Sequence, residues 1–165
     1  NYRPKDASIK LTQNNYETQP NQIVNTKFPF KYLRPFNEPV PNDWLIIEEN
    51  FVLFLIMNLP ILTNDFSATP QAKTSDGCMH MIFIKSGISK LELIKLFSDT
   101  VSGVHMESLF VEYVPIRAFR LEPLPVTSGS AVTGNFMIDG EKVPYGPIQG
   151  EVMPSLGNVF KFNKQ

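Results

Sequence analysis

The stretch NFMIDGEKVPYGPIQGEV, residues 135–152, contains a short apolar run that meets Asp139-Gly140 and is followed at once by an acid, Glu141. Asp-Gly between alternating apolar residues is the strongest short-range signal of a β-hairpin, because both turn positions can adopt positive φ. The sequence therefore predicts a hairpin here. A tight turn accounts for Asp139 and Gly140, so these residues alone assign no chemical role to Glu141.

Short strands are expected on both sides of this hairpin. Runs rich in Val, Ile, Phe and Tyr are separated by turn residues at short spacing, which is typical of an antiparallel sandwich or barrel. The predicted fold is mainly β, an antiparallel β-sandwich. Its expected strands are residues 43–49, 51–57, 78–85, 109–123, 135–138, 148–154 and 158–162.

One segment, residues 86–105, departs from this pattern and predicts an amphipathic helix of about three turns. Ser89 and Glu92 have the spacing of a capping box, and Gly103 lies where a helix C-cap is expected. A second set of apolar residues widens the apolar surface beyond one stripe, which suggests contacts on two sides. The main face carries Leu93, Leu96, Phe97 and Thr100, and the second set is Leu91, Ile94 and Val101.

Length and composition indicate one folded domain. A chain of 165 residues with 42% hydrophobic content can bury one sizeable core. Residues 1–42 are rich in Pro, Asn and Gln and predict a linker or long loop, so residues 43–165 are expected to form the β-sandwich. The chain begins with Asn1 and its opening residues lack the layout of a signal peptide, so we expect a piece of a longer protein.

Charge and cysteine content exclude several classes of protein. A net charge of −1, from 15 basic and 16 acidic residues, provides no electrostatic footprint for nucleic acid. The longest apolar stretch, residues 51–62, is too short for a membrane-spanning helix and is interrupted by Asn58 and Pro60. The single cysteine, Cys78, excludes an intrachain disulfide and fits a reducing compartment, with the cytoplasm as the default.

No catalytic group follows from the residues alone. The segment TSGSAVTGN, residues 127–135, lacks the Gly-Lys-Ser/Thr ending and the following helix of a phosphate-binding loop. Cys78, His80 and His105 lack the paired spacing of a zinc site, so we predict no metal site. Nothing in the sequence places either histidine beside Cys78 as a nucleophilic pair.

Several segments in the same order carry a family resemblance. They are DWLIIEENFVLFLI, DGCMHMIFIKSGISKLELIKLF, GVHM, VEYVPIRAFRLEP and FMIDGEKVPYGPIQGEVMP. The chain resembles the C-terminal domain of sphingosine kinases, in the diacylglycerol-kinase-like lipid kinase superfamily, from about Pro41 to Phe160. RAFRLEP, DGE and QGEVMP at their relative spacing are together more specific than any one of them.

The resemblance implies a two-domain enzyme that phosphorylates sphingosine with ATP. The N-terminal nucleotide-binding domain of such an enzyme holds the Gly-rich loop and the acid that accepts the proton of the lipid hydroxyl. Neither lies in this chain, so we expect no catalytic residue here and no activity from this piece alone. The implied cofactors are ATP and Mg²⁺, bound mainly by the absent domain. The implied partners are a sphingoid-base lipid, that kinase domain and a membrane surface contacted peripherally from the cytoplasm.

The same resemblance implies two sets of binding residues. Asp139, Gly140 and Glu141 are expected at the nucleotide site, where a carboxylate can act through Mg²⁺, water or a ribose hydroxyl. Thr100 and Ile82 depart from the larger apolar or aromatic residues of some relatives, which puts chain-length preference in doubt. The set expected to contact the lipid tail is Leu53, Leu55, Leu62, Phe66, Ile82, Leu93, Leu96, Phe97, Thr100 and His105.

Two alternatives stay open at this point. A ceramide or diacylglycerol kinase of the same superfamily would act on a two-chain lipid that lacks a free amine. A non-catalytic β-sandwich would carry or sense lipid, or bind another protein, without phosphorylating anything. For every apolar residue in the lipid set, ordinary core packing is the competing explanation.

Overall fold

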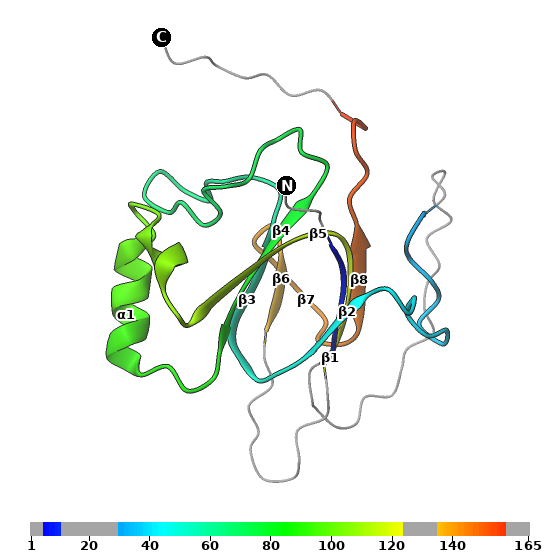
Figure 1. Ribbon diagram of the computed structural model, residues 1–165, viewed down its shortest axis with the longest axis horizontal. Coiled ribbons are helices and arrows are strands. Elements are labelled where there is room, and N and C mark those ends of the chain that lie inside the picture. The colour runs from blue at the N-terminus through cyan, green and yellow to red at the C-terminus, as the bar shows by residue number, and fades with distance from the viewer. Residues whose placement is uncertain (1–4, 11–29, 124–134, 158–165) are drawn as a thin grey trace.

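The computed structural model describes residues 5–10, 30–123 and 135–157, and its elements are shown in Figure 1. The fold is mainly β with one α-helix, which confirms the predicted class. The predicted strand at residues 158–162 lies outside the described residues. In chain order the elements are β1 (Lys5–Lys10), β2 (Leu45–Glu48), β3 (Phe51–Met57), β4 (Met79–Lys85), α1 (Lys90–Asp99), η1 (Val104–Glu107), β5 (Val111–Glu122), β6 (Phe136–Ile138), β7 (Glu141–Val143) and β8 (Ile148–Glu151).

The long strand β5 connects the two halves of the curved main sheet. Its first half pairs antiparallel with β4 as far as Ile116, which lies opposite Met79. Its second half, residues 118–121, pairs antiparallel with β8 on that same edge, while β1 pairs parallel on the other edge. The main sheet has the order β2-β1-β5-β4-β3, and Figure 1 shows β5 curving from the β4 side toward β8.

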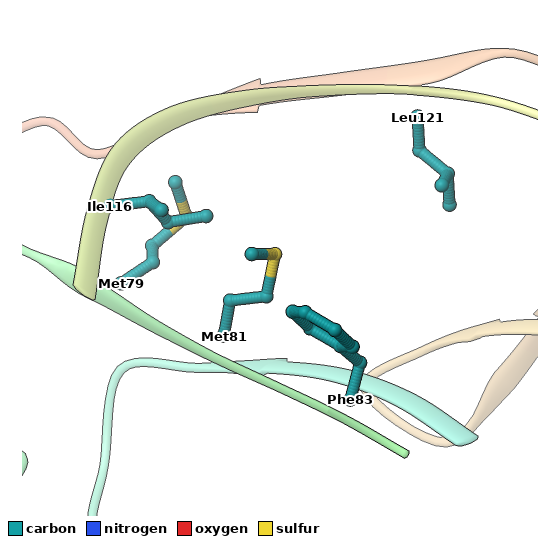
Figure 2. Close-up of a cluster of buried hydrophobic side chains, with 5 residues drawn as sticks. All are labelled: Met79, Met81, Phe83, Ile116 and Leu121. Carbon is teal, nitrogen blue, oxygen red and sulfur yellow. The ribbon is translucent and has the colours of Figure 1, made fainter. Parts of the chain in front are cut away.

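The core fills the concave side of this curved sheet. Met79, Met81 and Phe83 alternate along β4 and therefore point to one face of the strand. Figure 2 shows them facing Ile116 and Leu121 of β5 across a shared interior. All five are buried, so the contact between β4 and β5 forms the centre of the hydrophobic core.

The opposite face of β4 is buried as well, because non-strand segments cover it. His80, Ile82 and Ile84 alternate with the core residues and are all buried. Figure 1 shows α1 and η1, here called the helical cover, on the β3–β4 side of the sheet, away from β1, β2 and β8. The sheet therefore packs on two sides, with the sandwich core on one side and the helical cover on the other.

The predicted capping box begins α1, but the predicted C-cap is wrong. Ser89 Oγ accepts from the Glu92 N–H at 3.2 Å, and the Glu92 carboxylate accepts from the Ser89 N–H at 3.0 Å. The helix ends at Asp99, and its C-cap is Thr100, whose N–H donates to the carbonyls of Phe97 and Ser98. Gly103 instead precedes η1 with φ 79°, and a Cβ there would lie 3.0 Å from Pro70 Cγ. The glycine serves the chain reversal between the two helices.

Part of the segment predicted as a linker or long loop has regular structure. That prediction is wrong for Lys5–Lys10, which forms β1 between β2 and β5. Strand pairing uses backbone groups from distant parts of the chain, so local composition does not reveal it. Residues 30–42, here called the strap, have irregular backbone but hydrogen-bond to β5 and β8. The strap is therefore docked on the sandwich.

Shortening a core methionine should destabilise the domain, and shortening a surface methionine should not. Met81 is 0% exposed, so Met81→Ala should lower the free energy of unfolding by about 2–5 kcal/mol. Met137 is 64% exposed on β6, and Met137→Ala should change it by less than about 0.5 kcal/mol. Urea denaturation of both variants tests this, and equal losses would contradict the described core.

Candidate functional site

The Asp139-Gly140 turn closes a two-stranded hairpin, as predicted. Asp139 and Gly140 have φ of 50° and 86°, and Ile138 pairs with Glu141 across the turn. Two consecutive positive φ angles are the pattern of a type I′ turn, which suits the twist of a hairpin. Asp139 and Glu141 are both exposed. The turn therefore presents two carboxylates at the surface, although the structure does not test what they bind.

A cavity of about 750 Å³ opens beside this hairpin, a size typical of small-molecule sites. Its walls come from β3, β5, β6 and β8, and most of its lining residues are apolar. Among the described residues of the lining, Glu49 and Asp139 are the charged ones, and both are acidic. Leu53 and Leu55 from the predicted lipid set lie in the same lining. The cavity thus brings two predicted lipid-binding residues into one hollow with the turn.

The remaining predicted lipid residues lie elsewhere, at the helical cover of the sheet. Ile82 pairs with Leu55 in the β3–β4 ladder and is buried. On α1, Leu96 and Thr100 are buried, while Phe97 is 43% exposed. Leu93 is half-buried, and Leu62 is exposed in the loop after β3. Leu53 and Leu55 on β3 therefore connect the helical cover to the cavity.

Contacts between α1, η1 and the loop after β3 hold this cover together. The rings of Phe66 and Phe97 lie 6.4 Å apart, and the Ser67 N–H donates to the Thr100 carbonyl at 3.1 Å. His105 is buried on η1, and its Nε2 donates to the Ala68 carbonyl at 3.0 Å. His105 Nδ1 is buried without a partner in the described part of the chain. One ring nitrogen of His105 beneath the helical cover is therefore left without a hydrogen bond to the described residues.

His80 lies between an acid and a tyrosine. Its Nε2 is 3.0 Å from Asp76 Oδ2, and its Nδ1 is 2.7 Å from the Tyr113 hydroxyl. Because a carboxylate only accepts, Nε2–H donates to Asp76, and Nδ1 shares a hydrogen bond with the Tyr113 hydroxyl. The structure thus gives His80 a structural role that ties the loop before β4 to β5.

Cys78 shows no sign of a nucleophile. The His80 ring nitrogens contact Asp76 and Tyr113 and not the thiol. Burial, followed by the nearby Asp76 carboxylate, raises the pKa of the Cys78 thiol despite the opposing charge of Arg117. A raised pKa reduces the thiolate, which is the reactive form. Among the residues that the structure describes, no three His, Cys, Asp or Glu side chains gather to hold a metal ion.

Sequence reasoning missed the residues that dock the strap. Arg120 is 2% exposed, and its guanidinium donates to the carbonyls of Arg34 and Glu38, both at 2.7 Å. Glu151 accepts from three successive strap N–H groups. Both residues lie in motifs that carry the family resemblance, RAFRLEP and QGEVMP. Their partners are more than 80 residues away in sequence, so no local pattern indicates them.

Comparison with known proteins identifies the family of this sandwich. Residues 43–161 match the family described as the YegS C-terminal NAD kinase beta sandwich-like domain. The chain belongs to this family. In the described part of this YegS-type domain, no helix is both long enough and apolar enough to cross a membrane.

The predicted resemblance to sphingosine kinases is also confirmed. Human sphingosine kinase 2 is 37% identical over 133 residues, which cover 79% of this chain and 19% of that protein. Mouse sphingosine kinase 1 is 32% identical over 162 residues, covering 90% of this chain and 41% of that protein. Yeast sphingoid long chain base kinase 5 is 28% identical over 144 residues, which cover 85% of this chain and 20% of that protein. The chain thus spans one fifth to two fifths of these relatives.

Replacing Asp76 should destabilise the domain in a pH-dependent way. Burial raises the pKa of the Asp76 carboxyl, but the N–H groups of Lys73 and Cys78 and the His80 ring outweigh burial and leave it below its usual value. The ionised carboxylate therefore stabilises the fold above the unfolded-state pKa of about 3.9, and this contribution is lost as the pH falls through the lower folded-state pKa.

At pH 7, Asp76→Asn should lower the free energy of unfolding by about 1–2 kcal/mol, because an amide nitrogen cannot accept these hydrogen bonds. The difference from wild type should shrink below about pH 4. Denaturant titrations at several pH values measure both effects, with Asp43→Asn, at an exposed position, as the control. A difference that stays constant down to low pH would contradict the assigned role.

Proposed function

We propose that this chain is the lipid-binding C-terminal domain of an ATP-dependent sphingoid-base kinase. The whole enzyme would transfer the γ-phosphoryl group of ATP to the primary hydroxyl of sphingosine, giving sphingosine 1-phosphate. The names of the relatives support the chemistry. The single structural observation that supports the role of this domain is the cavity whose lining includes Leu53, Leu55 and Asp139.

The apolar residues supply binding energy for a hydrocarbon tail. Burying one methylene contributes about 0.8 kcal/mol, so a long single chain provides ample affinity wherever enough apolar surface is continuous. Leu53 and Leu55 border the cavity on one side and pair with buried residues beneath the helical cover on the other. A lipid tail that runs along β3 toward Phe66 and Phe97 would pass the segments that carry the predicted lipid-binding residues.

The Asp-Gly-Glu turn would contribute to the nucleotide site. An exposed carboxylate contacts a phosphate only through Mg²⁺ or water, or it accepts a hydrogen bond from a ribose hydroxyl. Glu141 directly follows the type I′ turn, and its exposed side chain is open to a ligand held by another domain. ATP and Mg²⁺ would be held mainly by that N-terminal domain.

In phosphoryl transfer, positioning and charge neutralisation supply most of the catalysis. This domain would therefore contribute by fixing the lipid hydroxyl in line with the γ-phosphate. We assign the proton-accepting acid to the N-terminal domain and expect this chain alone to be inactive. Because the substrate is insoluble, we also expect the cytoplasmic enzyme to contact membranes peripherally.

The choice of substrate is tested with the full-length protein and three lipids. Sphingosine should give the highest kcat/KM, because ceramide and diacylglycerol each carry two chains and no free amine. Preference for ceramide or diacylglycerol would contradict the proposed substrate. Absence of phosphorylation with all three, combined with lipid binding, would instead favour a carrier or sensor.

Removing the acid of the turn should affect the nucleotide alone. Glu141→Ala in the full-length protein should raise the KM for ATP about tenfold and leave the KM for sphingosine unchanged. Glu112→Ala is the matched control, because Glu112 is an exposed acid on β5 outside the hairpin. Steady-state kinetics measure both constants, and an unchanged KM for ATP would remove Glu141 from the nucleotide site.

Shortening Phe97 should affect the lipid alone. Phe97→Ala removes the ring that lies against Phe66, so the KM for sphingosine should rise about 5–10-fold with the KM for ATP unchanged. Ile94→Ala on the same helix is the control, since Ile94 is 66% exposed and lies outside the predicted lipid set. Equal effects of the two substitutions would argue against a tail site at this face.

A further inference from the structure

Glu151 binds the strap through its backbone. Its Oε1 accepts from the Lys31 N–H at 3.0 Å, and its Oε2 accepts from the N–H groups of Tyr32 and Leu33 at 2.9 and 3.2 Å. Hydrogen bonds to an ionised acceptor are stronger than neutral ones, and three successive donors form a ready-made anion site. The end of β8 is therefore tied to the start of the strap.

Arg120 binds the rest of the strap from the neighbouring strand. Besides the carbonyls of Arg34 and Glu38, its guanidinium donates to the Pro35 carbonyl at 3.1 Å and to Gln149 Oε1 at 3.2 Å. Gln149 Nε2 in turn donates to the Arg34 carbonyl at 3.0 Å. A buried guanidinium needs such partners, because an unpaired buried charge is very costly. We call Arg120, Gln149 and Glu151 the clamp.

The two faces of β8 are held by different parts of the protein. Gln149 and Glu151 point toward the strap, whereas Ile148 packs against the hydrophobic core. A Cβ added at Gly150 would lie 2.7 Å from Phe119 Cε1, because the Phe119 ring fills the space that a side chain would need there. Strand β8 is thus fixed between the core and the strap.

The hairpin that carries the turn is held at two points, by Phe136 of β6, which packs against the hydrophobic core, and by its connection to β8. Its strands β6 and β7 pair only with each other among the described strands. Four residues, 144–147, connect β7 to β8, and two of them, Pro144 and Pro147, restrict the backbone. The ring of Tyr145 in this connection lies 4.6 Å from the Phe136 ring of β6. A displacement of β8 would therefore shift the β7 side of the hairpin, including the turn, relative to the Phe136 anchor.

We propose that the clamp positions the Asp139-Gly140-Glu141 turn. By docking the strap onto β5 and β8, Arg120, Gln149 and Glu151 fix the strand to which the hairpin is attached. They are positioning residues and not catalytic residues, since their hydrogen bonds hold the strap, although Gln149 also borders the cavity. That the positioned turn serves a nucleotide rests on the proposed function, whereas the mechanical link between clamp and hairpin does not.

Hydrogen–deuterium exchange of the full chain tests the mechanical link. Glu151→Gln keeps the shape of the side chain and weakens its acceptors, so the amides of residues 31–33 should exchange faster. The amides of residues 137–142 should also exchange faster, by about tenfold, while those of β3 and β4 keep their wild-type rates. Glu122→Gln is the matched control, because Glu122 lies 3.8 Å from Arg120 and, within the described residues, does not hydrogen-bond to the strap backbone. Faster exchange in the strap with wild-type exchange in the hairpin would overturn the proposal.

Kinetics of the full-length protein test the consequence for the turn. Arg120→Lys should raise the KM for ATP several-fold with little change in the KM for sphingosine, a split that general destabilisation would not produce. In a Glu141→Ala background the same substitution should add almost nothing, because the misplaced turn no longer contributes. Fully additive effects would overturn the positioning role. If Arg120→Lys fails to fold, Glu151→Gln replaces it, because Glu151 hydrogen-bonds the strap and does not line the cavity.

The proposed function and the link between clamp and hairpin can be disproved independently of each other. A wild-type protein without kinase activity would remove the proposed function, and the exchange experiment alone would then decide whether the clamp controls the hairpin. Normal kinase activity together with an unperturbed hairpin in Glu151→Gln would remove the clamp and leave the proposed function intact.

Discussion

Strand β5 runs through both halves of the curved main sheet, and this sharing is the constraint on which the other elements depend. The strand pairs with β4 in its first half and with β8 in its second half, while β1 occupies its other edge. Its alternating side chains serve the core on one face, through Ile116 and Leu121, and the strap on the other, through Arg120. One strand therefore links the hydrophobic core, the cavity and the docked strap.

The cavity and the helical cover flank β3 from different sides. Figure 1 shows α1 at one end of the sheet and the β6–β7 hairpin behind its centre. Leu53 and Leu55 lie between these regions, since both line the cavity and both pair with buried residues of β4. An elongated apolar ligand suits this arrangement better than a compact one.

Local features could be predicted from the sequence because neighbouring residues determine them. The Asp-Gly turn and the Ser89–Glu92 capping box each need only a few adjacent residues, and both are confirmed. The end of α1 was misplaced because Gly103 resembles a C-cap although its positive φ serves the turn into η1. The nucleotide and lipid assignments came from the family resemblance, and no pattern of spacing would have provided them.

Long-range features could not be predicted, because their determinants are far apart in the chain. Strand β1 pairs with residues about 110 positions later, and the strap hydrogen-bonds to residues 82 to 120 positions away. Residues 1–42 are rich in Pro, Asn and Gln, and their described parts are held by the pairing of β1 and by the hydrogen bonds of Arg120 and Glu151 to the strap. The strap also contains aromatic residues, and the Phe36 ring lies against the Arg120 guanidinium. A single sequence indicates where apolar residues alternate but not which carbonyls a buried guanidinium will reach.

The most direct test of the account is a crystal structure of the full-length protein with sphingosine and a non-hydrolysable ATP analogue. The account predicts the lipid tail along β3, in contact with Leu53, Leu55 and the Phe66–Phe97 pair. It also predicts Glu141 within hydrogen-bonding reach of the nucleotide or of its Mg²⁺ and water shell. A tail bound away from β3, or a turn that faces solvent on the side opposite the nucleotide, would contradict it.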